Sequence, residues 1–217
     1  MKSIQVGFAI VGHPRCGSRS LATAFGQLGL KVGHEKLERD GIVSWWNTAR
    51  YQGDHSFKDP RLYPSEFTSR VIGHYIRNPI DAIPSILIEN QFRERKNNSY
   101  QFRQWILSKE FDVDLDEMSP LTAAATSFVL WNDLAAKISD LDQPILVERP
   151  DTRQLQAMLG GALPFTGKEI KLPRENTTAR KFGVDKWETS REDIIDATPE
   201  AFRPRLDYYL SLYDFLM

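Results

Sequence analysis

The stretch GHPRCGSRS, residues 12–20, decides which fold this chain is expected to adopt. Before it, residues 6–12 form a continuous apolar run that is typical of a buried parallel strand. After it, residues 18–30 have the apolar spacing of a helix, and that spacing stops at Gly29. The stretch is therefore expected to be the loop of a strand–loop–helix unit.

Strand and helix patterns alternate along the rest of the chain. Further strands are expected at 30–33, 70–76 and 144–148, and further helices at 42–51, 79–95, 102–111, 120–138, 151–159 and 185–217, the last interrupted near Pro199 and Pro204. Pro84 fits the helix over 79–95 only if it lies in the first turn. The alternation predicts a three-layer α/β fold with a mainly parallel central sheet and a helical C-terminal region, in one domain over residues 1–217.

Composition narrows the class of protein. The chain has 217 residues, of which 41% are hydrophobic and 26% charged, as expected for a globular protein rather than a disordered or collagen-like one. Its net charge of −1 lacks the basic excess of nucleic-acid-binding proteins. One cysteine, Cys16, rules out an intramolecular disulfide. Since no apolar run approaches the roughly 18 residues of a membrane span, we expect a soluble, cytoplasmic chain with neither nucleic acid nor membrane as partner.

The loop is suited to binding an anion. Backbone N–H groups at a helix N-terminus attract negative charge, and Gly17 lets the backbone approach a ligand closely. Arg15 carries a forked donor that suits phosphate, and Ser18 carries a hydroxyl. The simpler alternative is a strand–turn–helix with arginines on its surface. The candidate anion-binding residues are Pro14, Arg15, Cys16, Gly17, Ser18, Arg19 and Ser20.

The spacing of the loop is close to that of a Walker loop, because Gly12 and Gly17 are five residues apart. Ser18 stands where a Walker loop has its lysine, and the cationic side chain has moved back to Arg15. A nucleoside triphosphatase normally needs that lysine for its phosphates. A P-loop kinase with a displaced cation is therefore one alternative function.

A second motif runs from Arg77-Asn78-Pro79 to Ser85. It follows an expected strand and enters an expected helix, so Arg77 would lie at the strand end and Ser85 two turns into the helix. Both side chains would then be able to meet one anion. Taken alone, Arg-Asn-Pro is also a common turn between a strand and a helix.

The two motifs together resemble those of the PAPS-dependent sulfotransferases. Residues 14–20 resemble their 5′-phosphosulfate loop, and residues 77–85 resemble their 3′-phosphate motif, in the same order along the chain. Residues 144–160 look like the strand and helix that follow in many members. Residues 180–187 loosely resemble the basic segment that closes over the 3′-phosphate. That segment would add Arg180 and Lys181 to the donor site.

The resemblance implies a reaction. A sulfuryl group would move in line from PAPS to a hydroxyl or amine, releasing adenosine 3′,5′-bisphosphate without a metal ion. Arg15 and the loop amides would stabilise the charge on the leaving phosphate. Arg19 stands where the family usually has a second hydroxyl, which leaves its role open between phosphate ligand and outward salt bridge. Phe182 replaces a glycine of the family pattern.

An acceptor hydroxyl benefits from a general base. Two candidates, His34 and Glu35, follow the second expected strand. The resemblance favours Glu35, whereas the ordinary histidine pKa of about 6.5 suits His34. Because neighbouring strand positions point to opposite faces, only one is expected to reach the site. Lys58 resembles a catalytic lysine of carbohydrate-sulfating members, the alternative being a solvated turn lysine.

The acceptor is expected to be a small molecule or a carbohydrate, held by loops within residues 36–68 and 97–120, and a homodimer fits so short a chain. Four tryptophans either line an apolar acceptor pocket or belong to the core: Trp45, Trp46, Trp105 and Trp131. Besides the kinase, a third alternative is a binding module that holds the nucleotide without turnover.

Overall fold

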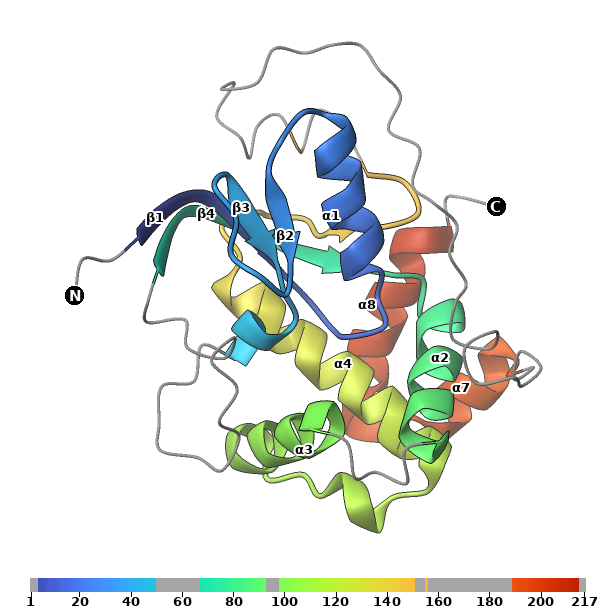
Figure 1. Ribbon diagram of the computed structural model, residues 1–217. Helices are drawn as coiled ribbons and strands as arrows, with labels where there is room; N and C mark the ends of the chain where they lie inside the picture. The colour runs from blue at the N-terminus through green and yellow to red at the C-terminus, as the bar shows by residue number, and fades with distance from the viewer. Residues whose placement is uncertain (1–3, 50–66, 93–97, 151–154, 156–188, 215–217) are drawn as a thin grey trace. The chain divides into compact units, whose positions relative to one another are not determined.

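The computed structural model describes residues 4–49, 67–92, 98–150, 155 and 189–214 (Figure 1). The chain divides into two compact units, which are described separately. The first comprises Met1–Ile76 with Leu134–Arg174, and the second Arg77–Asp133 with Glu175–Met217. The prediction of a single domain over 1–217 stays a prediction.

The first unit holds a five-stranded sheet whose strand pairs are all parallel. Its order is β2-β3-β1-β4-β5, and the longest pairing, β1 with β4, runs from Ile4↔Phe67 to Val11↔His74. The strands are β1 (Ile4–Val11), β2 (Val32–His34), β3 (Gly41–Val43), β4 (Phe67–Ile76) and β5 (Ile145–Leu146). The α/β class with a parallel sheet is thus confirmed.

The strand order places a switch point between β1 and β4. The chain leaving β1 leads to β2 on one side of β1, whereas the chain leaving β4 leads to β5 on the other side (Figure 1). In open parallel sheets, ligands bind beyond the carboxyl ends of the strands at such a reversal. The loop that follows Val11 therefore starts where this topology favours a ligand.

Helix α1 (Ser18–Gln27) contacts β2 and β3 (Figure 1). Its buried face includes Leu21 and Phe25, and the Phe25 ring centre lies 5.0 Å from that of Phe8 on β1. Gly29 ends the helix at φ 84°, with its N–H bonded to the Gly26 carbonyl and the Leu30 N–H bonded to the Phe25 carbonyl. This pair of bonds is a Schellman cap, which explains why the helical spacing stops at Gly29.

Two predictions in the first unit were wrong. Residues 42 and 43 belong to strand β3 rather than to a helix, and only η1 (Trp46–Ala49) is helical in that segment. Gly41 is part of the strand, where a Cβ would lie 2.5 Å from the Phe8 carbonyl oxygen. Strand β5 is also shorter than expected, because the Arg149 N–H turns back to bond the Leu146 carbonyl.

The second unit is helical in its described residues. Helix α2 contacts α7 and α8, and Phe128 on α4 packs edge-on against Tyr209 on α8. Helix α4 continues past this unit, and its Ala135 packs with Val11 and Ile72 in the first. The helices are α2 (Pro79–Phe92), α3 (Asn98–Phe111), α4 (Pro120–Ile138), α7 (Arg191–Ala197) and α8 (Arg203–Asp214), with short turns η4 (Leu115–Glu117) and η5 (Glu200–Phe202).

Prolines and caps account for most of the differences in this unit. Pro84 lies inside α2 beyond its first turn, contrary to expectation. Pro204 is the second residue of α8 and starts that helix instead of interrupting it, because a first-turn N–H needs no intrahelical partner. Helix α3 begins at Asn98, not at Phe102. The expected helix 151–159 lies outside the described residues except for Leu155.

In the part of the chain that the structure describes, no helix has both the length and the apolar character needed to cross a bilayer.

Candidate functional site

The loop between β1 and α1 has a backbone that two glycines make feasible. A Cβ on Gly12 would collide with the carbonyl oxygen and ring of Tyr75 on β4. Gly17 has φ 87°, and a Cβ there would lie 2.6 Å from Cγ1 of Val147. Arg15 also adopts a left-handed conformation, with φ 72°. Alternation of this kind turns successive N–H groups toward one side, as in anion-binding nests.

The loop carbonyls are held by side chains from elsewhere in the first unit. The Thr48 hydroxyl donates to the Gly12 carbonyl at 3.1 Å, and the Tyr75 hydroxyl donates to the His13 carbonyl at 3.1 Å. The Cys16 N–H donates to the same His13 carbonyl at 3.2 Å. Complete burial, followed by the nearby Glu35, raises the pKa of Tyr75 well above its usual range, so its hydroxyl stays a donor.

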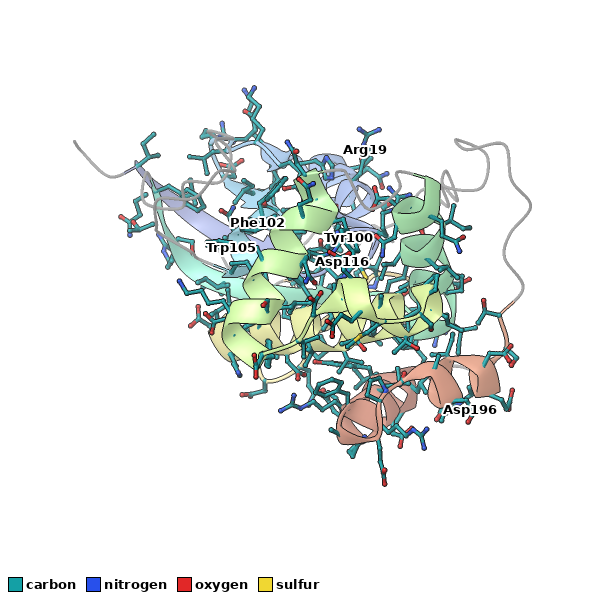
Figure 2. The ribbon with its side chains drawn as sticks, turned by 90° about the horizontal axis from the view of Figure 1, so that it is seen from below. Arg19, Tyr100, Phe102, Trp105, Asp116 and Asp196 are labelled. Atoms are coloured by element: carbon teal, nitrogen blue, oxygen red, sulfur yellow. The ribbon has the colours of Figure 1, made fainter. Side chains whose placement is uncertain are left out.

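The start of α1 favours negative charge. Gly17 caps the helix without a side-chain bond, and within α1 no acidic residue occupies the first turn. The Leu21 N–H donates to the Gly17 carbonyl at 3.0 Å, so the backbone N–H groups of a helix N-terminus lie directly after the loop. Arg15 is half-buried in the loop, whereas Arg19 is exposed on α1 and points away from the ribbon (Figure 2).

His34 contacts the loop directly. Its Nε2 lies 2.9 Å from the Ser18 hydroxyl oxygen, which joins the end of β2 to the start of α1. Burial, and secondarily the Arg19 guanidinium, lower the pKa of His34 from 6.5 to about 4. The imidazole is therefore neutral at neutral pH.

Glu35 is a tethered carboxylate. Its Oε2 accepts a bond of 2.6 Å from the Ser44 hydroxyl, and its Oε1 accepts the Trp45 N–H at 3.2 Å. The Glu35 side chain is 10% exposed.

The expectation that only one of His34 and Glu35 would face the site was wrong. Their side chains approach each other, with Nε2 and Oε1 3.8 Å apart. Glu35 lies one residue beyond β2 and has φ 55°, so the alternation of an extended strand no longer applies to it. Because the imidazole is neutral, this contact is not an ion pair at neutral pH.

The first unit thus brings together most of the predicted loop residues with both candidate bases. Pro14 and Cys16 are buried, and Ser20 is half-buried in the first turn of α1. Three side chains that sequence reasoning missed complete the site: Ser44, Thr48 and Tyr75. The sequence signal for two of them is their position, because Ser44 directly follows β3 and Tyr75 is near the end of β4, whereas Thr48 lies on η1.

The second motif belongs to the second unit. Asn78 caps α2, since its side-chain oxygen accepts the Ile80 N–H at 3.1 Å and its carbonyl accepts the Ala82 N–H at 2.9 Å. Arg77 is half-buried, and Ser85 is buried on α2. Three predicted residues lie outside the described residues: Lys58, Arg180 and Lys181.

The tryptophans divide between core and site. Trp131 is completely buried and packs edge-on with Phe102 (labelled in Figure 2), so it belongs to the core of the second unit. Trp105 is half-buried, with the Lys109 ammonium 5.6 Å from its ring centre. Trp45 and Trp46 stack at 3.8 Å beside Glu35's partner Ser44.

Over the described ranges, no cluster of three or more His, Cys, Asp or Glu side chains is arranged to hold a metal ion. No protein-family model, curated protein or solved structure matches the chain.

Proposed function

We propose that this chain is a PAPS-dependent sulfotransferase that moves a sulfuryl group to a hydroxyl or amine acceptor. One observation carries the proposal: a basic, amide-rich loop follows β1 at the switch point of a parallel sheet, with a tethered carboxylate and a neutral histidine beside it. The loop supplies charge stabilisation for a leaving phosphate, and the carboxylate supplies a proton acceptor.

On this proposal the loop is a phosphate loop of P-loop type, in the three-layer fold expected from the sequence. Arg15 and the N–H groups around Gly17 bind the phosphate that carries the sulfuryl group. Their arrangement exists before the ligand arrives, because Thr48 and Tyr75 already hold the loop carbonyls. A preformed set of donors stabilises developing charge without reorganising during the reaction.

The reaction balances as an in-line displacement. The acceptor oxygen attacks sulfur, the bond from sulfur to the bridging phosphate oxygen breaks, and that oxygen keeps the electron pair. The bisphosphate leaves with one more negative charge, which Arg15 and the loop N–H groups stabilise. The acceptor's proton passes to a general base.

Glu35 is the better base of the two candidates. The Nε2 of His34 is already engaged with Ser18, and a ring nitrogen has only one hydrogen-bonding position. A carboxylate has about four acceptor positions, and the bonds from Ser44 and Trp45 orient this one at the carboxyl edge of the sheet. His34 then serves the donor side, because its ring fixes the Ser18 hydroxyl that faces the phosphate.

The remaining assignments rest on the resemblance alone. Arg77 and Ser85, with Arg180 and Lys181, are proposed for the 3′-phosphate, and Lys58 for the sulfuryl group. A cytoplasmic location, a small-molecule or carbohydrate acceptor and a homodimer likewise stay predictions.

A nucleotide-dependent shift in melting temperature tests the part of the proposal that concerns binding of the sulfuryl donor. A ligand that binds only the folded state at one hundred times its Kd adds about 2.7 kcal/mol of stability, a rise of roughly 5–10 °C in Tm for a chain of this size. We expect adenosine 3′,5′-bisphosphate to produce this shift in the presence of EDTA. Arg15→Ala and Arg77→Ala should each abolish it.

Arg70→Ala is the matched control. Arg70 is exposed in the first half of β4, away from the carboxyl edge of the sheet, so its loss should leave the shift intact. A shift produced only by ATP with Mg²⁺ would favour the kinase. A bisphosphate shift with no sulfate transfer from labelled PAPS to any acceptor would favour a binding module.

A further inference from the structure

The imidazole of His34 lies between the two parts of the proposed reaction site. Its Nε2 is 2.9 Å from the Ser18 hydroxyl oxygen at the start of α1, and 3.8 Å from Oε1 of Glu35. The His34 side chain is 32% exposed, so the ring can exchange protons with solvent. A proton gained by this ring therefore acts both on the loop proposed for the donor and on the proposed base.

Burial and one nearby cation keep the ring neutral in the free protein. Strand β2 packs against α1 and β3. Helix α1 brings the exposed Arg19 close enough to act on the ring, whereas β3 has no titratable side chain. Burial, followed by the Arg19 charge, lowers the pKa of His34 to about 4, although Glu35 supplies a negative charge nearby. The connection between β2 and β3 holds two ion pairs of its own: Lys36 with Glu38, and Arg39 with Asp40.

An anion bound at the loop changes this balance. The loop touches the ring through Ser18, so a phosphate held by Arg15 and the loop N–H groups would lie beside the imidazole. A negative charge nearby favours the protonated form of a histidine. At a separation of about 6 Å and an effective dielectric constant of about 20, one such charge raises a pKa by about two units. We therefore expect the pKa of His34 to be higher in the complex than in the free protein.

We propose that binding of the donor at the loop is coupled to protonation of His34, which makes the site sensitive to pH. The imidazolium adds a positive charge beside the bound anion and so holds it more tightly. The same cation pairs with Glu35 and makes its carboxylate a weaker proton acceptor. Mild acid therefore strengthens binding of the donor and slows transfer to the acceptor. This inference rests on the proposed sulfotransferase function and adds its regulation by pH.

Adenosine 5′-phosphosulfate is the probe for binding, because its phosphosulfate group keeps a constant charge over the pH range in which histidine titrates. Between the pKa of the free protein and the higher pKa of the complex, only the complex carries the extra proton, so affinity rises as the pH falls. The Kd from isothermal titration calorimetry should be about 10-fold lower at about pH 5 than at about pH 7.5. Titration in two buffers with different heats of ionisation should show uptake of about half a proton or more at the lower pH.

Two variants test whether His34 is the group that takes up the proton. His34→Gln keeps a hydrogen-bonding group for Ser18 but does not titrate, so both the pH dependence of the Kd and the proton uptake should disappear. Arg19→Gln removes the cation that opposes protonation, so its rise in affinity should begin at a higher pH than in wild type. Because Arg19 is exposed, this variant tests the inference even if His34→Gln does not fold.

Arg39→Gln is the matched control for the loss of a cation. Arg39 is exposed and pairs with Asp40 at 2.8 Å, so its removal should leave the Kd on the wild-type pH curve. A curve shifted equally in Arg39→Gln and Arg19→Gln would reflect net charge alone and would overturn the inference.

Turnover with saturating PAPS tests the effect on Glu35. The wild-type kcat should fall about 10-fold between about pH 7.5 and about pH 5.5. The fall should be smaller in His34→Gln, because no imidazolium forms beside the carboxylate. Equal losses in the two proteins would overturn the proposed regulation.

The outcomes separate the two proposals. A wild-type Kd that is the same at both pH values, or a pH dependence that survives in His34→Gln, overturns the coupling to His34 while the donor assignment stands. If the wild type binds neither the phosphosulfate nor the bisphosphate at any pH, the sulfotransferase proposal itself is overturned, and this inference with it.

Discussion

The Ser18 hydroxyl and the His34 Nε2 lie 2.9 Å apart and join the first residue of α1 to the last residue of β2. The imidazole is neutral at neutral pH because burial lowers its pKa to about 4. In the tautomer that carries its proton on Nε2, the ring donates to the Ser18 oxygen and the serine proton is left for another acceptor. In either tautomer the contact holds the Ser18 hydroxyl in the loop without adding a charge there.

Replacing His34 with glutamine should make the fold less sensitive to acid. The unfolded histidine titrates near 6.5 and the folded one at about 4, so the unfolded state binds more protons in between. Wild-type stability should thus fall as the pH drops from about 7 to about 4. The side chain is 32% exposed, so we expect a loss of only about 1–2 kcal/mol.

Urea unfolding of wild type and His34→Gln across this pH range measures the difference. Arg19→Gln is the companion variant, because it removes only the second cause of the lowered His34 pKa. Its loss of stability between about pH 7 and about pH 4 should therefore be intermediate between those of wild type and His34→Gln. Parallel pH curves for wild type and His34→Gln would contradict the neutral state assigned to this ring.

Glu35→Gln should separate turnover from donor binding. The glutamine keeps the size of the side chain but cannot accept a proton, so kcat should fall by about 10²–10⁴. The bisphosphate-induced shift in Tm should stay. Ser44→Ala removes one bond to the carboxylate and should reduce kcat by a smaller factor, since the base remains. Unchanged turnover in Glu35→Gln would show that Glu35 is not the general base.

Tyr75→Phe should loosen the loop. Without the hydroxyl, the buried His13 carbonyl loses a donor, at a cost of about 1–2 kcal/mol, and bisphosphate affinity should fall. Tyr209→Phe is the control, because it removes a buried hydroxyl that donates to Asp133 at 2.9 Å in the second unit. Similar losses of stability in both variants, with weaker nucleotide binding only in Tyr75→Phe, are the expected pattern in chemical denaturation and titration.

Three glycines separate backbone strain from steric contact. Gly17→Ala should cost about 2–4 kcal/mol, because a left-handed conformation and the Val147 contact both oppose a Cβ. Gly29→Ala has the same strain but open space, so about 1 kcal/mol is expected. Gly26→Ala in α1 has neither and should gain about 0.5–1 kcal/mol. Equal free energies of unfolding for Gly17→Ala and Gly29→Ala would show that Val147 yields without cost.

Local patterns predicted strand β1, helix α1 and the loop between them. The run of apolar residues before Gly12 needs no tertiary information to be read as a buried strand, and β1 confirms it. The periodicity of residues 42–51 predicted a helix, but residues 42 and 43 pair with β1 as part of strand β3. Gly41 looks like a chain break until β1 lies beside it, and only that neighbour requires a residue without a side chain.

The site shows the same division. Arg15 and Ser18 carry their chemistry in a contiguous motif, so sequence spacing is enough to find them. Thr48 and Tyr75 act through single bonds to loop carbonyls, and such bonds depend on the register of strands far apart in the chain. Glu35 has φ 55°, so its side chain does not follow the alternating directions of strand residues. A single backbone angle of this kind leaves no pattern in the sequence.

Because η1 holds both the first carbonyl of the loop and, through Trp45, the carboxylate of Glu35, a single turn of backbone anchors two separate tasks. On the proposed function, a substitution that reshapes this turn would alter both the loop proposed to bind the nucleotide and the carboxylate proposed as the base. We therefore expect substitutions that change the acceptor without weakening nucleotide binding to lie outside Trp46–Ala49.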